Sequence, residues 1–321
     1  MGNGWNCMNG DSKRLFIDKD MEVCSTRMSQ TSVNHVHANF DENKSAYVIQ
    51  FAFRKKKIAL LQRRTLRKAN YFIRPKASKE EVQQKDSQAY IFSDGSAYSG
   101  SWLNNLRHGH GVQQWACGES YKGEWLCDKA SGQGCFTFAN GSFYDGQWED
   151  NLASGFGVYQ TPFGYKYEGE WKKDLPHGFG TETLANGDVY EGNFVLGLRE
   201  GQGTLKFKDG STYVGEWLKG RMHGKGKMTW GDGRVYDGEW QNGKFHGEGV
   251  YTWPDGRKYV GQYIYGKKEG YGEYFSADGR VYKGQWRDGK QHGKGKYYSK
   301  DGTFEEATWR QGEIEKPLKA N

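Results

Sequence analysis

Five histidines precede a glycine at intervals that are multiples of 23 residues, and such a row could supply metal ligands or general bases: His108, His177, His223, His246 and His292. Histidine ligands of zinc usually lie about three to five residues apart, which is not the spacing found here. Other copies carry a different polar residue at the same position: Ser131, Ser154, Glu200 and Glu269. Because such exchange is typical of turns, we expect these histidines to stabilise turns rather than to bind metal.

A glutamate recurs in the motif G-E-W and could provide paired carboxylates for acid–base catalysis. It is found at Glu124, Glu170, Glu216 and Glu239. Its recurrence in register favours a solvated sheet face with cross-strand pairing to Lys or Arg. The repeated G-x-G motifs lack the strand-turn-helix context of a phosphate-binding loop, and the cysteines lack the spacing of zinc or redox sites. The sequence therefore predicts no catalytic residue, no metal site and no cofactor, as expected of a non-enzymatic protein.

A repeat of 23 residues organises the chain from about residue 90 onward. The tyrosine of a Y-x-G motif recurs without an insertion at Tyr98, Tyr121, Tyr144, Tyr167, Tyr190, Tyr213, Tyr236, Tyr259 and Tyr282. A large ring follows four positions after each tyrosine, at Trp102, Trp125, Trp148, Trp171, Phe194, Trp217, Trp240, Tyr263 and Trp286. A tenth copy is degenerate, because Glu305 takes the tyrosine position while Trp309 is retained. Terminal repeats of an array are often atypical in this way.

Each repeat is predicted to form two short strands joined by a tight turn. Residues 224–230 and 236–240 both alternate glycine, methionine or ring residues with polar residues, which is the period of a strand. Asp232-Gly233 lies between them and is a pair that tolerates positive φ in tight hairpins. A glycine within a strand costs stability but leaves a gap where a tyrosine or tryptophan ring can lie flat. We therefore expect β-hairpins whose glycines receive neighbouring rings.

The pattern Y-x-G-x-W followed by H-G-x-G resembles the membrane occupation and recognition nexus (MORN) repeat family. It is present, for example, as YDGEWQNGKFHGEG from Tyr236, and nine in-phase copies lie within about residues 90 to 312. The resemblance implies an all-β fold, an elongated, twisted, single antiparallel sheet of 23-residue hairpins with a grooved face. It also implies a stand-alone scaffold similar to radial spoke head proteins of cilia, junctional membrane tethers and parasite cytoskeletal organisers.

Composition divides the chain into a basic N-terminal part and a neutral repeat array. Residues 1–89 contain 17 Lys and Arg against 9 Asp and Glu, whereas the remainder contains 29 against 30. The part before the array is expected to be mostly helical or irregular. We predict a polar extension (1–44), a basic amphipathic helix (45–74), a linker (75–89), the repeat array with nine full copies and one degenerate copy (90–312), and a C-terminal tail (313–321).

The aromatic face of the array is a candidate groove for a partner peptide or helix, because a single-layer sheet cannot cover both of its sides. The residues that would line this groove are Trp102, Trp125, Trp148, Trp171, Trp217, Trp240 and Trp286. The alternative is that the rings of neighbouring repeats cover one another fully.

The N-terminal segment supplies a second candidate site. Within residues 45–70 four apolar residues fall along one helical stripe with basic residues around it, namely Tyr47, Phe51, Ile58 and Leu61. The sequence IQFAFR resembles the first half of an IQ motif, a helix that binds calmodulin. Lys55 and Ala59 depart from that motif, in which glycine and a second basic residue are usual. The partner-binding residues expected here are Ile49, Gln50, Arg54, Lys55 and Lys57.

Several partners suit this basic segment. A calmodulin-like acidic protein and an anionic membrane surface both bind basic amphipathic helices, and the helix could also dock on the sheet or on a neighbouring protein. The start MGNGWNC is similar to a lipidation site at Gly2 and Cys7, although Asn6 stands where Ser or Thr is preferred. Nucleic acid is not expected as a partner, because the repeat array offers no basic face. No apolar run approaches the roughly 18 residues of a membrane span.

The combined expectation is a scaffold that holds or spaces other structural proteins along an aromatic-lined ribbon. The family resemblance and the IQ-like motif favour the cytoplasm and cytoskeleton, and there the axoneme of a cilium or flagellum, in a complex such as a radial spoke. This last step is an analogy at the level of the family. The alternative is a peripheral membrane tether that binds phosphoinositides through the basic helix and the repeat face.

Overall fold

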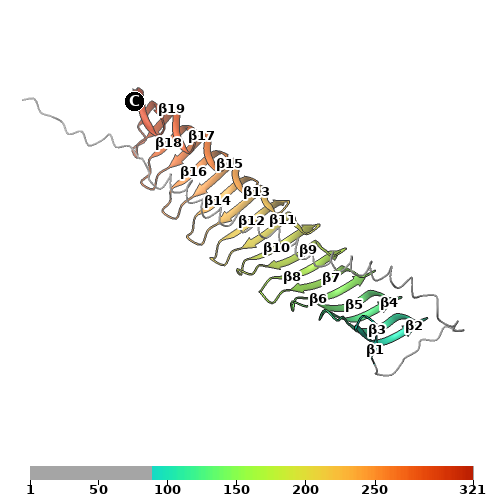
Figure 1. The fold of residues 1–321 in the computed structure, drawn as a ribbon. Coiled ribbons are helices and arrows are strands. Elements are labelled where there is room, and N and C mark those ends of the chain that lie inside the picture. The colour runs from blue at the N-terminus through green and yellow to red at the C-terminus, as the bar shows by residue number, and fades with distance from the viewer. Residues whose placement is uncertain (1–88, 321) are drawn as a thin grey trace, which may run out of the picture. The chain divides into compact units, whose positions relative to one another are not determined.

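The computed structural model describes residues 89–320, which form strands and turns with no helix in that range. The strands follow one another in chain order (Figure 1). Two compact units are distinguished, one containing residues 89–221 and the other residues 222–320. The helix predicted over 45–74, with its IQ-like residues, the polar extension and nearly all of the linker lie outside the described residues.

The first unit contains the strands β1 (Tyr90–Ile91), β2 (Ala97–Leu103), β3 (Leu106–Gln114), β4 (Ser120–Leu126), β5 (Lys129–Thr137), β6 (Phe143–Glu149), β7 (Leu152–Gln160), β8 (Lys166–Lys172), β9 (Leu175–Thr183), β10 (Val189–Val195), β11 (Leu198–Lys206) and β12 (Thr212–Leu218).

The second unit contains β13 (Arg221–Thr229), which begins at the boundary, β14 (Val235–Gln241), β15 (Lys244–Thr252), β16 (Lys258–Ile264), β17 (Lys267–Phe275), β18 (Val281–Arg287), β19 (Lys290–Tyr298), β20 (Phe304–Arg310) and β21 (Glu313–Ala320). Strand β21 pairs with β20 and runs through the residues set apart above as a tail.

Within each unit every strand pairs antiparallel with the next strand in the chain. In the pair β14 and β15, for example, Tyr236 lies opposite Tyr251 and Gly238 lies opposite Gly249. The same register recurs one repeat later between β16 and β17, where Tyr259 lies opposite Tyr274. The prediction of an all-β, open antiparallel architecture built from 23-residue hairpins is therefore confirmed.

The Asp-Gly turns are three-residue loops, which differs from the tight hairpin expected. In one of them Gly233 has a φ of 86° and donates its N–H to the carbonyl of Trp230, at 2.9 Å. The N–H of Trp230 in turn donates to the carbonyl of Arg234, at 2.9 Å. The Asp232 carboxylate accepts the N–H of Arg234 at 3.1 Å, as Asx turns do. Only the glycine takes the left-handed conformation, while the Asp or Asn is needed for its side-chain oxygen.

The tight two-residue turns lie at the opposite ends of the strands. Asn104 and Asn105 both have positive φ (49° and 61°), as do Cys127 and Asp128 (46° and 67°), which is the type I′ geometry that matches strand twist. The first of these two positions holds residues as different as Cys127 and Leu196, whose φ is 50°. Propensity for positive φ does not identify this position in the sequence.

The tight turns also join neighbouring repeats. The N–H of Asp174 donates to the carbonyl of Ala153 at 3.0 Å, and the Asp174 carboxylate accepts the N–H of Ala153 at 2.8 Å. One repeat later Gly197 donates its N–H to the carbonyl of Pro176 at 2.8 Å. Proline has no N–H to offer, so a side-chain acceptor at position 197 would gain nothing there. Glycine continues at this turn position in later repeats, where Gly220 donates to the carbonyl of Arg199 and Gly243 to that of Met222, both at 2.9 Å, so the glycine does not depend on a proline beside it.

The strand glycines receive tyrosine rings, as predicted. A Cβ built on Gly249 would lie 2.5 Å from the Tyr236 hydroxyl and 2.6 Å from its ring. One built on Gly238 would lie 2.6 Å from the Cα of Gly249. No side chain fits either position without displacing the ring or the facing strand. The two glycines that face each other across each hairpin are therefore the floor on which the tyrosine lies.

The glycine of H-G introduces a bulge that the Glu of G-E-W stabilises. Gly178 has a φ of 62°, and a Cβ built on it would lie 2.5 Å from the Glu170 carboxylate. That carboxylate accepts the N–H of Phe179 at 3.0 Å, and Glu124 accepts the N–H of Gln133 in the same way at 2.8 Å. These two glutamates thus accept hydrogen bonds from the backbone at the bulge, which differs from the expected pairing with Lys or Arg.

The sheet has two different faces. We call the face that bears these glutamates the polar face, and the opposite face, which bears the tyrosines and tryptophans, the ring face.

Candidate interaction surfaces

The ring face is closed by its own side chains. Tyr236 meets Trp240 of its own repeat edge-on, with ring centroids 5.2 Å apart, and Tyr263 of the next repeat at 5.4 Å. In the first unit Tyr167 meets Trp171 and Phe194 in the same manner, both at 5.1 Å. Such edge-to-face contacts are favourable beyond the area that they bury. Within each unit the rings form a ladder in which a tyrosine such as Tyr167 or Tyr236 touches two neighbours.

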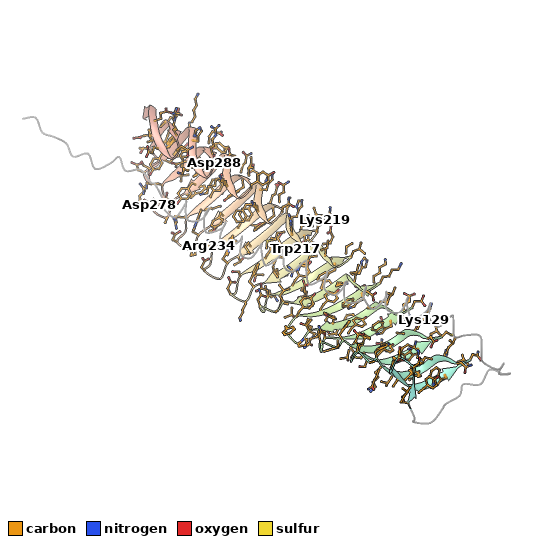
Figure 2. The ribbon with its side chains drawn as sticks, viewed as in Figure 1. Lys129, Trp217, Lys219, Arg234, Asp278 and Asp288 are labelled. Carbon is orange, nitrogen blue, oxygen red and sulfur yellow. The ribbon has the colours of Figure 1, made fainter. Side chains whose placement is uncertain are left out.

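The tryptophans predicted to line a groove are buried in this ladder. Six of them are exposed by only 2 to 5%: Trp125, Trp148, Trp171, Trp217, Trp240 and Trp286. Trp102, beside the short first strand, is half-buried. The indole N–H also has an internal partner, since Trp240 donates to the carbonyl of Gly226 at 2.9 Å and Trp148 to that of Gly134 at 2.7 Å. A partner on this face would meet rings that already cover one another. Trp217, one of the six, is labelled on β12 in Figure 2.

Burial also governs the ionisation of the tyrosines. Desolvation raises the pKa of Tyr98 to about 12, although the nearby Arg107 acts in the opposite direction. The pKa values of Tyr121, Tyr167, Tyr236 and Tyr259 are raised well above the usual range, chiefly by desolvation. Each hydroxyl donates to a backbone carbonyl three residues on, as Tyr236 does to Glu239 at 2.8 Å. The phenols are therefore structural groups that stay neutral at ordinary pH.

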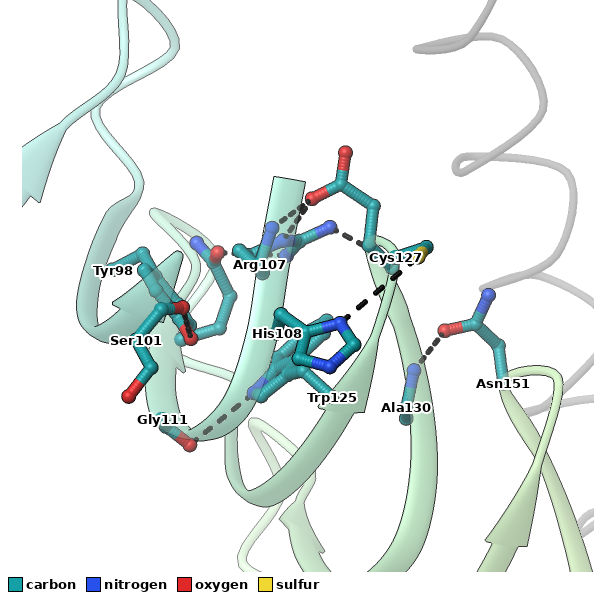
Figure 3. A network of polar contacts seen from close by, with 11 residues as sticks. Tyr98, Ser101, Arg107, His108, Gly111, Trp125, Cys127, Ala130 and Asn151 are labelled. Carbon is teal, nitrogen blue, oxygen red and sulfur yellow. Dashed lines mark hydrogen bonds and ion pairs between the residues drawn. The ribbon is translucent and has the colours of Figure 1, made fainter. Parts of the chain in front are cut away.

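Two arginines interrupt the ring face. Arg107 is 6% exposed and lies over the Trp125 ring with its guanidinium carbon 4.1 Å from the centroid (Figure 3). Its Nε donates to the Asp128 carboxylate at 2.9 Å and its Nη1 to the Gln113 amide oxygen at 2.9 Å. The guanidinium is thus satisfied within the sheet and not presented to a ligand.

Arg199 forms the second such site. Its Nε and Nη2 donate to one oxygen of Glu182 at 3.0 and 2.8 Å, and the Tyr165 hydroxyl donates to the other at 2.8 Å. The arginine also lies over the Tyr190 ring, 4.7 Å from its centroid. Sequence reasoning missed this buried ion pair. The sequence did contain a sign of it. Glu182 and Arg199 occupy positions that hold the apolar residues Leu205 and Met222 one repeat later.

The histidine position faces the tight turn of the following repeat. Where it holds Glu, the carboxylate accepts a turn N–H: Glu200 from Lys219 and Glu269 from Asp288, both at 2.9 Å. His108 approaches the equivalent turn residue, with Nδ1 4.0 Å from the Cys127 sulfur (Figure 3). The contacts of the glutamates agree with a turn role for the position, whereas Nδ1 is buried without a hydrogen-bond partner in His177, His223, His246 and His292. Among residues 89–320 no group of three His, Cys, Asp or Glu side chains is arranged to hold a metal ion.

The described residues therefore define a repeat protein built as an open antiparallel sheet. The side chains of its ring face pack against one another. The MORN repeat model matches nine stretches of the chain, at residues 98–118, 121–143, 144–162, 167–189, 190–212, 213–233, 236–256, 259–279 and 282–304. The chain belongs to the MORN-repeat family. This repeat is an interaction module and not a catalytic domain. The described part of the chain also contains no helix with the length and apolar character to cross a membrane.

No curated protein matches the sequence at a significant level. Among solved structures, the chain is similar to the TCP10 domain of Danio rerio CPAP in complex with a peptide of Danio rerio STIL, with 10% identity, 73% of this chain and 98% of that chain covered, and a TM-score of 0.41. The TCP domain of Drosophila melanogaster SAS-4 in complex with a proline-rich motif of Ana2 gives 11% identity, 60% and 99% coverage, and a TM-score of 0.31. Likenesses at these scores carry no argument about function.

Proposed function

We propose that the chain is a non-enzymatic scaffold that holds or spaces structural proteins, and that it works in a ciliary or flagellar axonemal complex such as a radial spoke. The observation that supports the scaffold role is a difference between the two faces of the sheet. The rings of the ring face pack against one another and are buried in the repeats after the first, where Trp102 is half-buried, while the polar face carries side chains that differ from repeat to repeat. A constant frame with variable exposed positions suits binding to several partners.

The location in the axoneme is supported by the family and by the IQ-like residues at Ile49, Gln50 and Arg54. Calmodulin or a calmodulin-like protein is the partner that those residues suit, and nucleic acid is not a proposed partner. Proximity labelling of the tagged chain in ciliated cells is expected to enrich axonemal proteins over a freely diffusing labelling control. Enrichment of membrane proteins without axonemal ones would contradict the proposal.

The calmodulin contact has its own test. The double substitution Ile49→Asp with Arg54→Glu removes the apolar anchor and reverses a charge, so it is expected to abolish capture by immobilised calmodulin. The matched control is Ile91→Asp with Arg310→Glu, which makes the same changes at exposed positions of the repeat array. Equal capture of both variants would exclude the IQ-like residues as the contact.

The second candidate is a peripheral membrane tether that binds phosphoinositides through the basic N-terminal segment and the repeat face. The specific observation in its favour is the run of basic residues between 54 and 74, which suits an anionic surface. Flotation with phosphoinositide vesicles, with and without residues 1–88, separates the two functions. Flotation that requires residues 1–88 favours the tether, and its absence favours the scaffold.

A further inference from the structure

The polar face of β6 to β10 exposes two large apolar side chains from consecutive repeats. Phe156 on β7 and Phe179 on β9 occupy the same repeat position and are 55% and 51% exposed. The neighbouring copies of this position carry Gln133 and Gln202, and later copies carry Lys225, Glu248, Tyr271 and Lys294. Among the described repeats this is the one place where two phenylalanines follow each other. An exposed pair of this size is a candidate interaction surface.

Acidic residues surround the pair. Phe156 lies opposite Glu170 in the register of β7 and β8. Next to this row, Val158 lies between Asp145 and Glu168, and Thr181 lies between Glu168 and Glu191. On these five strands the polar face carries five acidic residues, Asp145, Glu149, Glu168, Glu170 and Glu191, against two basic ones, Lys166 and Lys172. We call Phe156, Phe179 and these five acidic residues the acidic patch.

We propose that residues 45–74 of the same chain dock on the acidic patch. This segment contains nine Lys and Arg and no Asp or Glu, so its charge is opposite to that of the patch. The helix predicted from its sequence would place Phe51 and Ile58 on one apolar stripe. A basic amphipathic segment on an apolar, acid-rimmed surface follows the chemistry of helix recognition by calmodulin-like proteins. The docking surface thus belongs to the sheet and its occupant to the N-terminal part of the chain.

The dimensions agree with this docking. Phe156 and Phe179 lie two strands apart, which is about 9.6 Å at the usual strand spacing. Phe51 and Ile58 are seven residues apart, which is about 10.5 Å along a helix. Residues 75–88 join the segment to the described sheet and can span at most about 46 Å when extended. Seven strand spacings separate β1 from β8, about 34 Å, so the connection is long enough.

Hydrogen–deuterium exchange of the purified full-length chain tests the proposal without any other protein present. In the wild type, amides within residues 45–74 are expected to exchange at least about tenfold more slowly than in the double variant Phe156→Lys with Phe179→Lys, which removes both apolar side chains and places positive charge where the basic segment would lie. Raising the salt concentration is expected to weaken the protection, because exposed charges are screened. The variant places basic groups at exposed positions, one of them opposite Glu170, so the melting temperature is not expected to fall.

The matched control is Tyr271→Lys, which introduces the same residue at the same repeat position of the other unit, where Tyr271 is 50% exposed. It is expected to leave the protection of 45–74 as in the wild type. A second variant, Phe51→Glu with Ile58→Glu, lies outside the sheet and is expected to release the segment equally. The proposal is overturned if residues 45–74 are unprotected in the wild type, or if protection survives the change at Phe156 and Phe179. Protection that falls on dilution would identify a second copy as the host, and would also overturn it.

Discussion

The hydroxyl of Tyr236 donates a hydrogen bond to the carbonyl of Glu239 at 2.8 Å, and this contact holds the tyrosine ring across the backbone of the hairpin. The same bond occurs at 2.9 Å from Tyr121 to Glu124 and from Tyr167 to Glu170. The ring can reach that carbonyl only because the two positions beneath it have no side chain. Ring, carbonyl and glycine pair therefore form one unit of packing, repeated along the array.

Replacing Gly249 with valine is expected to destabilise the protein by more than about 1 kcal/mol, because overpacking forces the ring of Tyr236 from its place. The measurement is chemical denaturation of the purified chain. Gly256→Asn is the control in the same repeat. Its site is open, with no atom within 4 Å of a built Cβ, and Asn tolerates a φ of 88°. Equal stability of the two variants would show that the tyrosine does not depend on the glycine floor.

The Asx contact in the three-residue loops predicts a smaller effect. Asn140 accepts the N–H of Ser142 at 3.0 Å, so Asn140→Ala is expected to cost about 0.5 to 1.5 kcal/mol of unfolding free energy. Asn140→Asp keeps the accepting oxygen and is expected to behave as the wild type. The comparison is made by thermal melting, and a loss shared by both variants would indicate a requirement for the amide itself.

The buried ion pair of Arg199 and Glu182 predicts that one substitution lowers the free energy of unfolding and that further substitutions around it raise it again. Arg199→Met alone leaves the carboxylate buried and is expected to cost about 3 to 5 kcal/mol. Combining it with Glu182→Leu and Tyr165→Phe removes the buried carboxylate together with the hydroxyl that donates to it, and is expected to restore most of the loss. A cycle of these variants by urea denaturation measures the coupling. Additive losses would mean that the two side chains do not depend on each other.

The raised tyrosine pKa values predict loss of stability in alkali. In the unfolded chain tyrosine titrates near about 10, whereas burial raises the pKa of Tyr98 to about 12 and that of the other ladder tyrosines further. The folded state binds these protons more tightly, so its stability is full below pH about 10 and falls as the pH rises beyond it. Tyrosinate absorbance and circular dichroism are expected to change together. Ionisation that precedes unfolding would contradict the burial of the phenols.

The period of 23 residues was sufficient to predict the hairpins, the family and the contact between ring and glycine, because each depends on residues close in sequence. The tight turns at Cys127 and Leu196 were not predictable from residue type, since their positive φ is imposed by the pairing of the flanking strands. The burial of the tryptophans could not be settled from composition either, because it depends on how closely consecutive repeats approach. The pair of Arg199 and Glu182 was visible as a departure from apolar residues, but its meaning required the register of both strands.

The turn contact between Asp174 and Ala153 bears on how the number of repeats can change during evolution. Every bond of this kind connects a residue with another about one period away, so each module carries its own means of attachment. Removing or duplicating one complete module within residues 121–189 would leave matching ends, and the remaining modules would meet as before. Whole repeats can therefore be gained or lost without disturbing their neighbours. A deletion of a few residues inside one repeat would instead shift the register of the strands that pair with it.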